Sequence, residues 1–472
     1  ISGAGGAQDL IINSTGATTI SQAVTALASL TTDASGSTIL QGNVTTSALQ
    51  TYGDAVTISG DRTLQGTTVS MASVQGDGGD DDELTITGIF DLNGAATADL
   101  KTLSVSSSSN LGGNVTTSTT QTYTGAVVMS GGNRTLTATQ VNFGDTVDGG
   151  NAELAIVGIL NLDGALTNTT NLSVSSTSTL DADVTTTGTQ TYTGGVTLGT
   201  GTRTLQGSTV TFGSTLAGGG QNLTITGDAV FGGNATGLGA LDVSGTLAAN
   251  ATNITATNES ITIQGTTTIA DGITLVVDSG TADKDITFAA ITAGDAEGQN
   301  LTIDAGTNAN AQIFLNGDVT NLDTLSITDA GILNLVGNIT VDTLTIPTAV
   351  NNVIVSGNIT TTADTSFANV GTTVIGNATS DTNTFGGGLD ITAGPTSATA
   401  ITLQGTIATT NDQIDLGDSN TGIRIADVTT ISTGAGAAAV INLAGAISGT
   451  SQATDDLIIN STYQNPNLGL TK

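Results

Sequence analysis

The sequence predicts an all-β protein whose fold is a parallel β-helix, or β-solenoid, of about 20 coils. Three observations predict this class. A phrase of about 70 residues recurs along the chain, its strands are short with alternating apolar and polar residues, and almost no segment has helical periodicity. Units that repeat at a fixed spacing in strand-like sequence stack, and each buries a face on the next.

The repeated phrase is clearest in three copies, which occupy residues 40–110, 111–179 and 180–250. Each copy contains Gln-Thr-Tyr, then an apolar strand, then Arg-Thr-Leu. The tyrosines and the arginines both recur at the spacing of the copies (Tyr52, Tyr123 and Tyr192; Arg62, Arg134 and Arg203). A coil of a parallel β-helix takes roughly 20–25 residues, so we expect each copy to form about three coils.

The rest of the chain, residues 251–472, continues the pattern in diverged form. LTIDAGTNANAQIFLNG from Leu301 matches LTITGIFDLNG from Leu84 with an insertion. No Pro- or Ser-rich hinge and no run of charge separates one part from another. Contacts in a solenoid are between neighbouring coils, so its length is not limited by a single round core. We therefore expect residues 1–472 to form a single continuous solenoid.

The predicted strands have one face buried in the core and one face exposed to solvent. In LTIT from Leu84 and LSVS from Leu103, aliphatic residues occupy one parity and Thr or Ser the other. SQAVTALASL from Ser21 is the one candidate helix, and it aligns better with the strands of the repeats. LKTLSV from Leu100 has the spacing of a leucine-rich repeat, but the helical half of such a repeat is missing.

Composition excludes several classes of function. The chain has no Cys, His or Trp, which removes imidazole bases, thiolate nucleophiles and His/Cys metal sites. Seven basic residues against 40 acidic ones give a net charge of −33, so we expect no nucleic acid partner. No stretch reaches 18 apolar residues, so we expect no membrane insertion as a helix. No acidic pair stands out as a glycosidase site, and we expect no enzyme.

One phrase occurs near both ends of the sequence. DLIINST begins at Asp9 and again at Asp456, so the chain shows the same phase of the repeat in both places. Neither segment has the polar character of a solenoid cap. Uncapped coils expose unpaired strand edges, which favour head-to-tail stacking of copies. We therefore expect copies of the chain to be its main partner, end to end, with lateral association as a further alternative.

The phrases QTYTGAV, RTLTATQVNFG, LTITG and LSVSS resemble the strand repeats of large bacterial exported proteins. These are the filamentous-haemagglutinin-like adhesins and the passengers of autotransporters. The resemblance covers residues 40–250 well and the remainder loosely, and its motifs are of low specificity. It implies a right-handed parallel β-helix at the cell surface with an adhesive or scaffold role. The secretion domain and the translocating barrel of those families are not visible in the sequence.

One loop is dense in carboxylates. Hard oxygen ligands at this density can hold Ca²⁺, the one cofactor that the sequence suggests. The alternative is a solvated turn, because the other two copies have TVDGGNAE and TLAGGGQN at this place. The candidate ligands are Asp77, Asp80, Asp81, Asp82 and Glu83.

The recurring arginines and tyrosines each allow two interpretations. The arginines Arg62, Arg134 and Arg203 form either a basic stripe for acidic glycans or, as we favour, corner residues that pair with a carboxylate or carbonyls. The tyrosines Tyr52, Tyr123 and Tyr192 form either a platform for sugars or, as we favour, a stack along the solenoid, since their equal phase predicts that they lie in register.

Asn-x-Ser/Thr occurs sixteen times, with examples at Asn43, Asn114 and Asn133. Glycosylation suits a surface protein. The alternative is compositional, because many matches arise by chance in a chain so rich in Asn, Thr and Ser. Asn43 and Asn114 are equivalent positions of the repeat, and Asp183 replaces them in the third copy.

Together these patterns predict a non-catalytic extracellular structural protein, a subunit of a surface filament, sheath or matrix assembled head to tail. The second hypothesis is an adhesin passenger, a rod that binds host or neighbouring cells through glycans or another surface ligand. The third is a polysaccharide-active β-helix enzyme, which would need a cleft with an exposed acidic pair.

Overall fold

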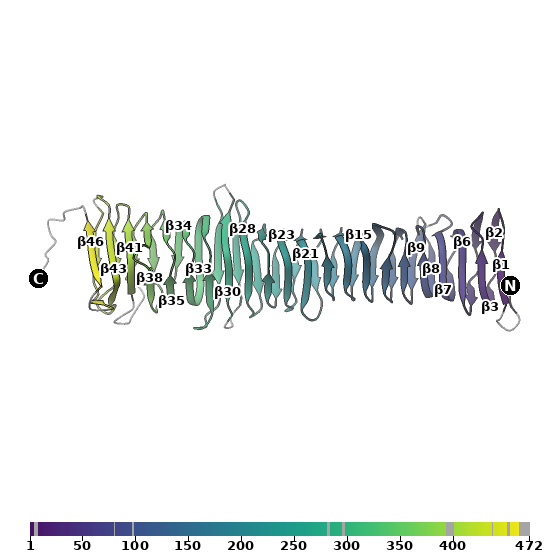
Figure 1. Cartoon of the computed structure of the whole chain (residues 1–472), viewed down its shortest axis with the longest axis horizontal. Helices are drawn as coiled ribbons and strands as arrows, with labels where there is room; N and C mark the ends of the chain where they lie inside the picture. The colour runs from purple at the N-terminus through teal and green to yellow at the C-terminus, as the bar shows by residue number, and fades with distance from the viewer. Residues whose placement is uncertain are drawn as a thin grey trace, which may run out of the picture. The chain divides into compact units, whose positions relative to one another are not determined.

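The computed structural model describes residues 1–3, 8–79, 81–96, 99–280, 284–294, 298–392, 401–436, 438–450 and 454–461. Within them the chain is a β-solenoid of about 21 turns with parallel strands (Figure 1). This confirms the predicted fold class and the predicted number of coils. The segment from Ser21 that could have been a helix forms strand β3 (Val24–Thr32). Within the described ranges, no helix has the length and hydropathy that crossing a bilayer requires.

The chain forms two compact units, and their boundary passes through strand β23 (Leu223–Phe231). Unit 1 comprises residues 1–221 and 225–228, and unit 2 comprises residues 222–224 and 229–472. That residues 1–472 form one continuous solenoid stays a prediction.

Many strands of unit 1 are short, and the long ones turn a corner without a break. They are β1 (Gln8–Ile12), β2 (Ala17–Ile20), β3 (Val24–Thr32), β4 (Ser37–Leu40), β5 (Val44–Thr46), β6 (Leu49–Ile58), β7 (Arg62–Gln75), β8 (Asp82–Leu92), β9 (Leu100–Val105), β10 (Ser109–Leu111), β11 (Val115–Thr116), β12 (Thr120–Tyr123), β13 (Val127–Met129), β14 (Arg134–Phe143), β15 (Val147–Leu162), β16 (Leu166–Val174), β17 (Ser178–Leu180), β18 (Val184–Thr186), β19 (Thr189–Tyr192), β20 (Val196–Leu198), β21 (Arg203–Phe212) and β22 (Leu216–Ala217).

Unit 2 is built from the same kind of strand. Its strands after β23 are β24 (Ala235–Leu238), β25 (Leu241–Val243), β26 (Leu247–Ala249), β27 (Asn253–Ala256), β28 (Ile261–Ile269), β29 (Thr274–Asp278), β30 (Ile286–Ala293), β31 (Asn300–Asp304), β32 (Gln312–Leu315), β33 (Val319–Leu335), β34 (Ile339–Ile346), β35 (Val350–Val355), β36 (Ile359–Thr361), β37 (Thr365–Phe367), β38 (Thr373–Ile375), β39 (Thr382–Phe385), β40 (Leu389–Ile391), β41 (Ile401–Thr409), β42 (Ile414–Leu416), β43 (Ile423–Thr433), β44 (Ile441–Leu443), β45 (Ile447–Gly449) and β46 (Asp456–Ser461).

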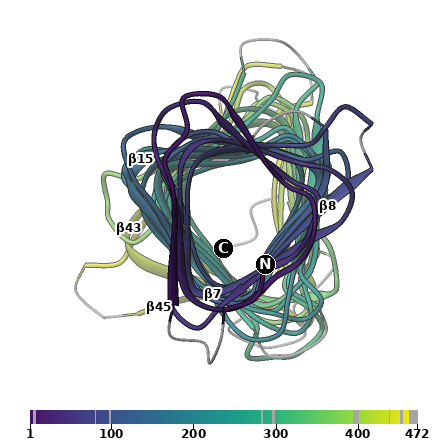
Figure 2. The ribbon, with the colours of Figure 1, turned by 90° about the vertical axis from the view of Figure 1, so that its right-hand side faces the viewer.

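Each coil of unit 1 has three sides, and the strand register assigns every inward residue to one of them. Figure 2 shows the backbone of successive coils following one another around the interior. Side A carries Leu30, Gln50, Val69, Phe90, Ser109, Val127, Val147, Leu166, Val184 and Leu205. Side B carries Thr38, Val56, Val74, Ala96, Val115, Leu136, Ile156, Val174, Tyr192 and Phe212. Side C carries Val24, Val44, Leu64, Ile86, Val105, Tyr123, Phe143, Leu162, Leu180 and Leu198.

The core of unit 1 is the stack of these inward residues. Leu64, Ile86, Tyr123, Phe143 and Leu162 all lie on side C, and each is fully buried. Stacked rungs about 4.8 Å apart bring each apolar side chain against the next, which removes its surface from water and adds dispersion contacts. The alternation that predicted the strands is therefore the division between interior and solvent.

The sequence repeat does not close on a whole number of coils. Between Tyr52 on side A and Tyr123 on side C the chain takes eleven sides, and from Tyr123 to Tyr192 on side B it takes eleven again. At three sides per coil, one repeat spans three and two-thirds coils rather than the three that we predicted. The reason is coil length, because register partners such as Ser109 and Val127 lie closer together in the sequence than the coil length we assumed.

Candidate functional site

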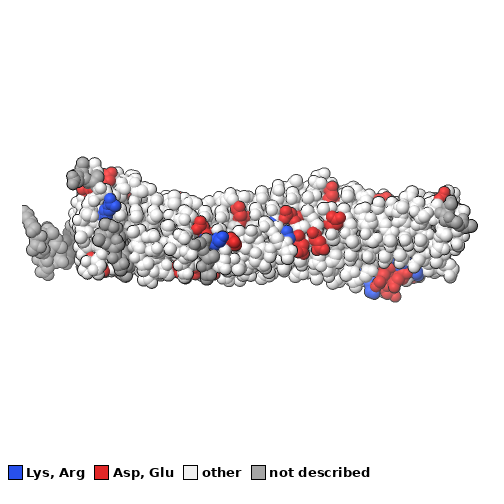
Figure 3. Space-filling view, turned by 90° about the horizontal axis from the view of Figure 1, so that it is seen from below, with Lys and Arg blue, Asp and Glu red and all other residues white. Residues whose placement is uncertain are grey.

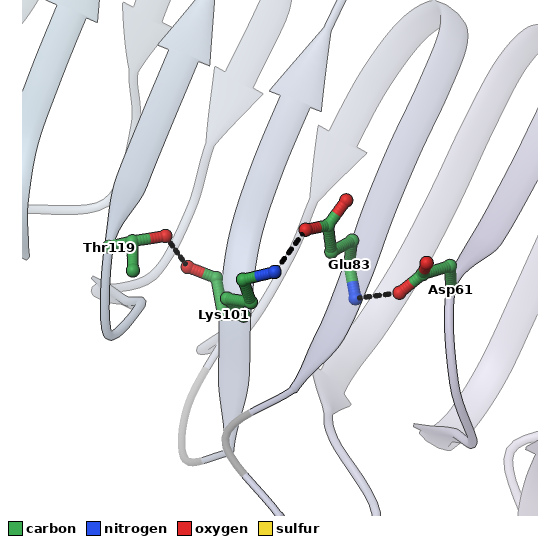
Figure 4. Close-up of polar contacts among 4 residues, drawn as sticks. All are labelled: Asp61, Glu83, Lys101 and Thr119. Carbon is green, nitrogen blue, oxygen red and sulfur yellow. Dashed lines mark hydrogen bonds and ion pairs between the residues drawn. The ribbon is translucent and has the colours of Figure 1, made fainter.

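The acidic loop of unit 1 lies at a corner where neighbouring coils are tied together by side chains (Figure 4). The Nζ atom of Lys101 lies 2.7 Å from Oε1 of Glu83. The backbone N–H of Glu83 donates to the carboxylate of Asp61, 3.2 Å away, and the hydroxyl of Thr119 donates to the carbonyl of Lys101, 2.7 Å away. These four residues belong to successive coils, so the contacts run along the solenoid.

Charges at this corner favour the protonated form of Lys101. Its hydrogen bond with Glu83 is the largest cause, and the charges of Glu83, Asp61 and Asp81 add to it, so the pKa of Lys101 is raised. Figure 3 shows acidic and basic side chains crowded together at one place on the right-hand side of the view, among large areas with no charged side chain. Because the pair is exposed to solvent, its contribution to stability is small.

The predicted calcium ligands differ in what they already bind. Asp82 is buried, and its carboxylate accepts hydrogen bonds from the backbone N–H groups of Gly60 and Asp77. Asp77 and Asp81 are exposed, Glu83 is paired with Lys101, and Asp80 lies outside the described residues. Among the residues that the structure describes, no group of three His, Cys, Asp or Glu side chains could hold a metal ion. Calcium at this loop stays a prediction.

The three repeated arginines fasten one coil to the previous one through backbone carbonyls. In Arg134 the guanidinium donates to the carbonyls of Leu111, Asn133 and Gly112 at 2.9, 2.7 and 2.8 Å. Arg62 and Arg203 also bind three carbonyls each, one in the previous coil and two in their own turn. Arg62 lies on side C, Arg134 on side B and Arg203 on side A. The arginines therefore do not form a stripe along one side.

A buried glutamine in each repeat is the feature that sequence reasoning missed. The side-chain amide of Gln121 donates to the carbonyls of Val115 and Thr137 at 3.1 and 2.9 Å, and its oxygen accepts from the Tyr123 hydroxyl at 3.2 Å. The amide thus binds backbone carbonyls inside the core, and the Thr137 carbonyl also accepts the backbone N–H of Thr117 at 2.9 Å. The equivalent residues Gln50 and Gln190 make the same three contacts. The signal was available, because Gln precedes each repeated Tyr by two positions and shares its inward parity.

The predicted stack of tyrosine on tyrosine is wrong. Tyr52, Tyr123 and Tyr192 lie on three different sides, because the repeat advances by eleven sides rather than a multiple of three. Tyr123 stacks instead on Phe143 of the next coil with ring centroids 5.5 Å apart, and Tyr192 stacks on Phe212 at 5.8 Å. Burial raises the pKa of all three tyrosines. They are core residues and offer no platform to a sugar.

The Asn-x-Thr motifs have a structural origin at the corners. The side-chain oxygen of Asn114 accepts the backbone N–H of Thr135 in the next coil at 2.9 Å, and Asn43 does the same with Thr63 at 3.0 Å. The next residue points inward and is apolar, and the following one points outward, where Thr is favoured. A corner Asn thus generates the motif without any glycan. Asn43, Asn114 and Asn133 are all exposed, and their glycosylation stays a prediction.

No family model, curated protein or solved structure matches the chain. The resemblance to exported bacterial adhesins stays a prediction. What the geometry offers is a surface of stacked strands on which corner side chains such as Asn43 and Asn114 hold one coil to the next.

Proposed function

We propose that the chain is a non-catalytic extracellular structural protein, a subunit of a surface filament, sheath or matrix whose coils stack head to tail between copies. One observation carries the proposal. The segment DLII occurs in both β1 and β46, and it pairs with its neighbouring strand through one edge in β1 and through the opposite edge in β46. In β1 it pairs with β3, which follows it, and Leu10 lies opposite Leu30. In β46 it pairs with β43, which precedes it, and Ile459 lies opposite Ile431.

One strand sequence thus accepts a neighbouring coil on either edge, which is what a joint between two copies requires. Parallel pairing uses backbone groups that do not distinguish a strand of the same chain from a strand of another. Ile459 points inward in the same column as Ile407 and Ile431, which are fully buried, yet it is 52% exposed. A further coil stacked on β46 would remove this apolar surface from water.

The test is negative-stain electron microscopy of the purified chain, in calcium and then in chelator. We expect long uniform fibres, and their loss in chelator would add a bound cation to the joint. Ile459→Lys places a charge where the next coil must stack, so it should abolish the fibres. Ile458→Lys is the matched control, because Ile458 lies beside Thr430 on the outward parity and should leave fibres intact.

Two outcomes contradict the proposal. Single particles in both buffers would leave the adhesin as the better account. Fibres that form equally well with Ile459→Lys would show that this edge is not the joint.

A further inference from the structure

Unit 2 contains a side on which outward apolar residues line up in one column. The register places Thr287, Phe314, Asn334, Ile354, Val374 and Thr402 directly above one another on successive coils. Ile332 occupies the neighbouring outward column, between Gln312 and Asn352. These side chains point away from the core, because the residues that alternate with them, such as Leu333 and Val353, are fully buried.

We name the outward residues Phe314, Ile332, Ile354 and Val374 the neutral face. Ile354 is 36% exposed, and the other three are partly exposed. Two further exposed aliphatic residues, Val336 and Val370, stand at the corners beside it. Residues 312–315, 332–335, 352–355 and 373–375 include no acidic or basic residue, although the whole chain carries a net charge of −33. Beyond Thr402 the column continues to Arg424, so the uncharged surface ends there.

One outward column of unit 1 shows the contrast. The column through Val128 contains Ser70, Asp91, Asn110 and Asp148. Val128 is 46% exposed, so it is as accessible as Ile354 but has polar or charged neighbours on both sides. An isolated exposed aliphatic residue needs no explanation, whereas several in register make a continuous surface.

We infer that the neutral face is a lateral contact between two copies of this chain. This inference rests on the proposed function, for which it names the surface that joins neighbouring filaments into a sheath or matrix. The net charge of the chain indicates which surface binds the neutral face. Two copies at −33 repel one another wherever their acidic surfaces meet, and a second neutral face is a partner surface that is both apolar and free of carboxylates. In a two-fold pairing each copy supplies the same face, and the two sheets pack about 10 Å apart.

The face spans four rungs, which is small for a stable dimer. In a filament, however, every subunit presents it once, so a weak pairwise contact is multiplied along two neighbouring fibres. Lateral association should therefore be strong between filaments and weak between single copies, where a covalent cross-linker is needed to trap it.

A single cysteine reports on this contact directly, because the natural chain has no cysteine. We would introduce Ile354→Cys and treat the protein with a short bismaleimide reagent, with Val128→Cys as the matched control. Both are made in the Ile459→Lys background, so that head-to-tail stacking does not contribute and the two proposals fail separately. We expect roughly fivefold or more covalent dimer from Ile354→Cys than from Val128→Cys at the same concentration.

A second variant checks the apolar origin of the contact. This variant adds Phe314→Thr and Val374→Thr to Ile354→Cys. Threonine is β-branched and already occupies both ends of the column, so we expect the fold to be retained. We expect the excess of covalent dimer to be lost. Equal dimer from Ile354→Cys and Val128→Cys, or an excess that survives the two threonines, would overturn the inference.

Discussion

Both units are stacks of parallel coils, but they differ in how like side chains are distributed over the sides of the coil. In unit 1 the repeated residues, such as Gln121 and Arg134, fall on sides C and B, and their equivalents occupy the other sides in turn. In unit 2 the repeat has diverged, and like residues stack on one side. Asp278, Asp304 and Asp329 lie opposite one another in three successive coils, and the neutral face spans four.

This difference shows that an accurately kept sequence repeat prevents like residues from forming a row along one side. A repeat of eleven sides rotates each copy by one side, so a feature of the repeat is spread around the coil and never forms a row. A row forms only when residues one coil apart in the sequence are alike. A sequence that instead keeps residues about 70 positions apart alike does not meet this requirement. The lateral contact that we infer is accordingly placed on unit 2.

The largest expected effect comes from the buried glutamine of unit 1. Gln121→Ala removes the amide bonds to the Val115 and Thr137 carbonyls, leaves the Tyr123 hydroxyl without its partner and opens a cavity, so it should lower the free energy of unfolding by about 3 kcal/mol or more. Tyr123→Phe removes one bond and should cost about 1 kcal/mol. Chemical denaturation followed by circular dichroism measures both. Because Gln50 and Gln121 lie more than three coils apart, the losses of Gln50→Ala and Gln121→Ala should add; a strong coupling would contradict their independence.

The arginine that fastens coils should be the next in size. Arg134→Lys keeps the charge but cannot bind three carbonyls with a planar group, so we expect a loss of about 2 kcal/mol in the same unfolding assay. If the arginine acted mainly as a surface charge, Lys would be as good as Arg and the unfolding midpoint would not change.

The aspartate column of unit 2 predicts a dependence of stability on pH. Burial first, and then the charge of the preceding aspartate, raises the pKa of Asp304 and of Asp329. A pKa raised on folding stabilises the protein below the unfolded pKa of about 3.9, and this stability is lost as the pH rises through the folded pKa. Asp304→Asn should therefore stabilise unit 2 at pH 7, by about 0.5 kcal/mol given its exposure, and have little effect at pH 3.

Asp418 provides the control of opposite sign. The backbone N–H of Asn420 is the main cause that lowers the pKa of Asp418. Its contribution is present above the unfolded pKa and lost in acid, so Asp418→Asn should destabilise at pH 7 and not at pH 3. Equal pH profiles for the two variants, recorded as thermal midpoints, would disprove the role assigned to the column.

The smallest effect should come from Asn114→Asp. Asp183 stands at the equivalent corner of the third copy, and its carboxylate accepts the N–H of Thr204 at 2.8 Å, so an Asp can replace the Asn. We expect a change below about 0.5 kcal/mol, whereas Asn114→Ala should cost about 1 kcal/mol through the lost bond. Equal unfolding midpoints for the Ala and Asp variants would mean that the corner bond does not contribute.

The sequence was sufficient for the fold class because the parity of LTIT and LSVS reports directly which residues face inward. It was not sufficient for the side on which Tyr123 lies, since the side depends on coil length, and a small error in the length of each coil accumulates over a repeat. Gln121 was missed because an inward polar residue breaks the parity rule unless its partners are known. The neutral face could not be read from the sequence, because Phe314 and Ile354 share a column only through the register.

The register of eleven sides is the claim on which the comparison depends, and disulfide formation tests it most directly in a chain without cysteine. The side chains of Thr122 and Asn142 meet across neighbouring coils, with Nδ2 and Oγ1 3.3 Å apart, which suits a disulfide. A repeat of three whole coils, about 24 residues each, would instead place Thr122 opposite Thr146. Mass spectrometry after mild oxidation should find the intramolecular bond in Thr122→Cys/Asn142→Cys and not in Thr122→Cys/Thr146→Cys; the reverse result would contradict the account.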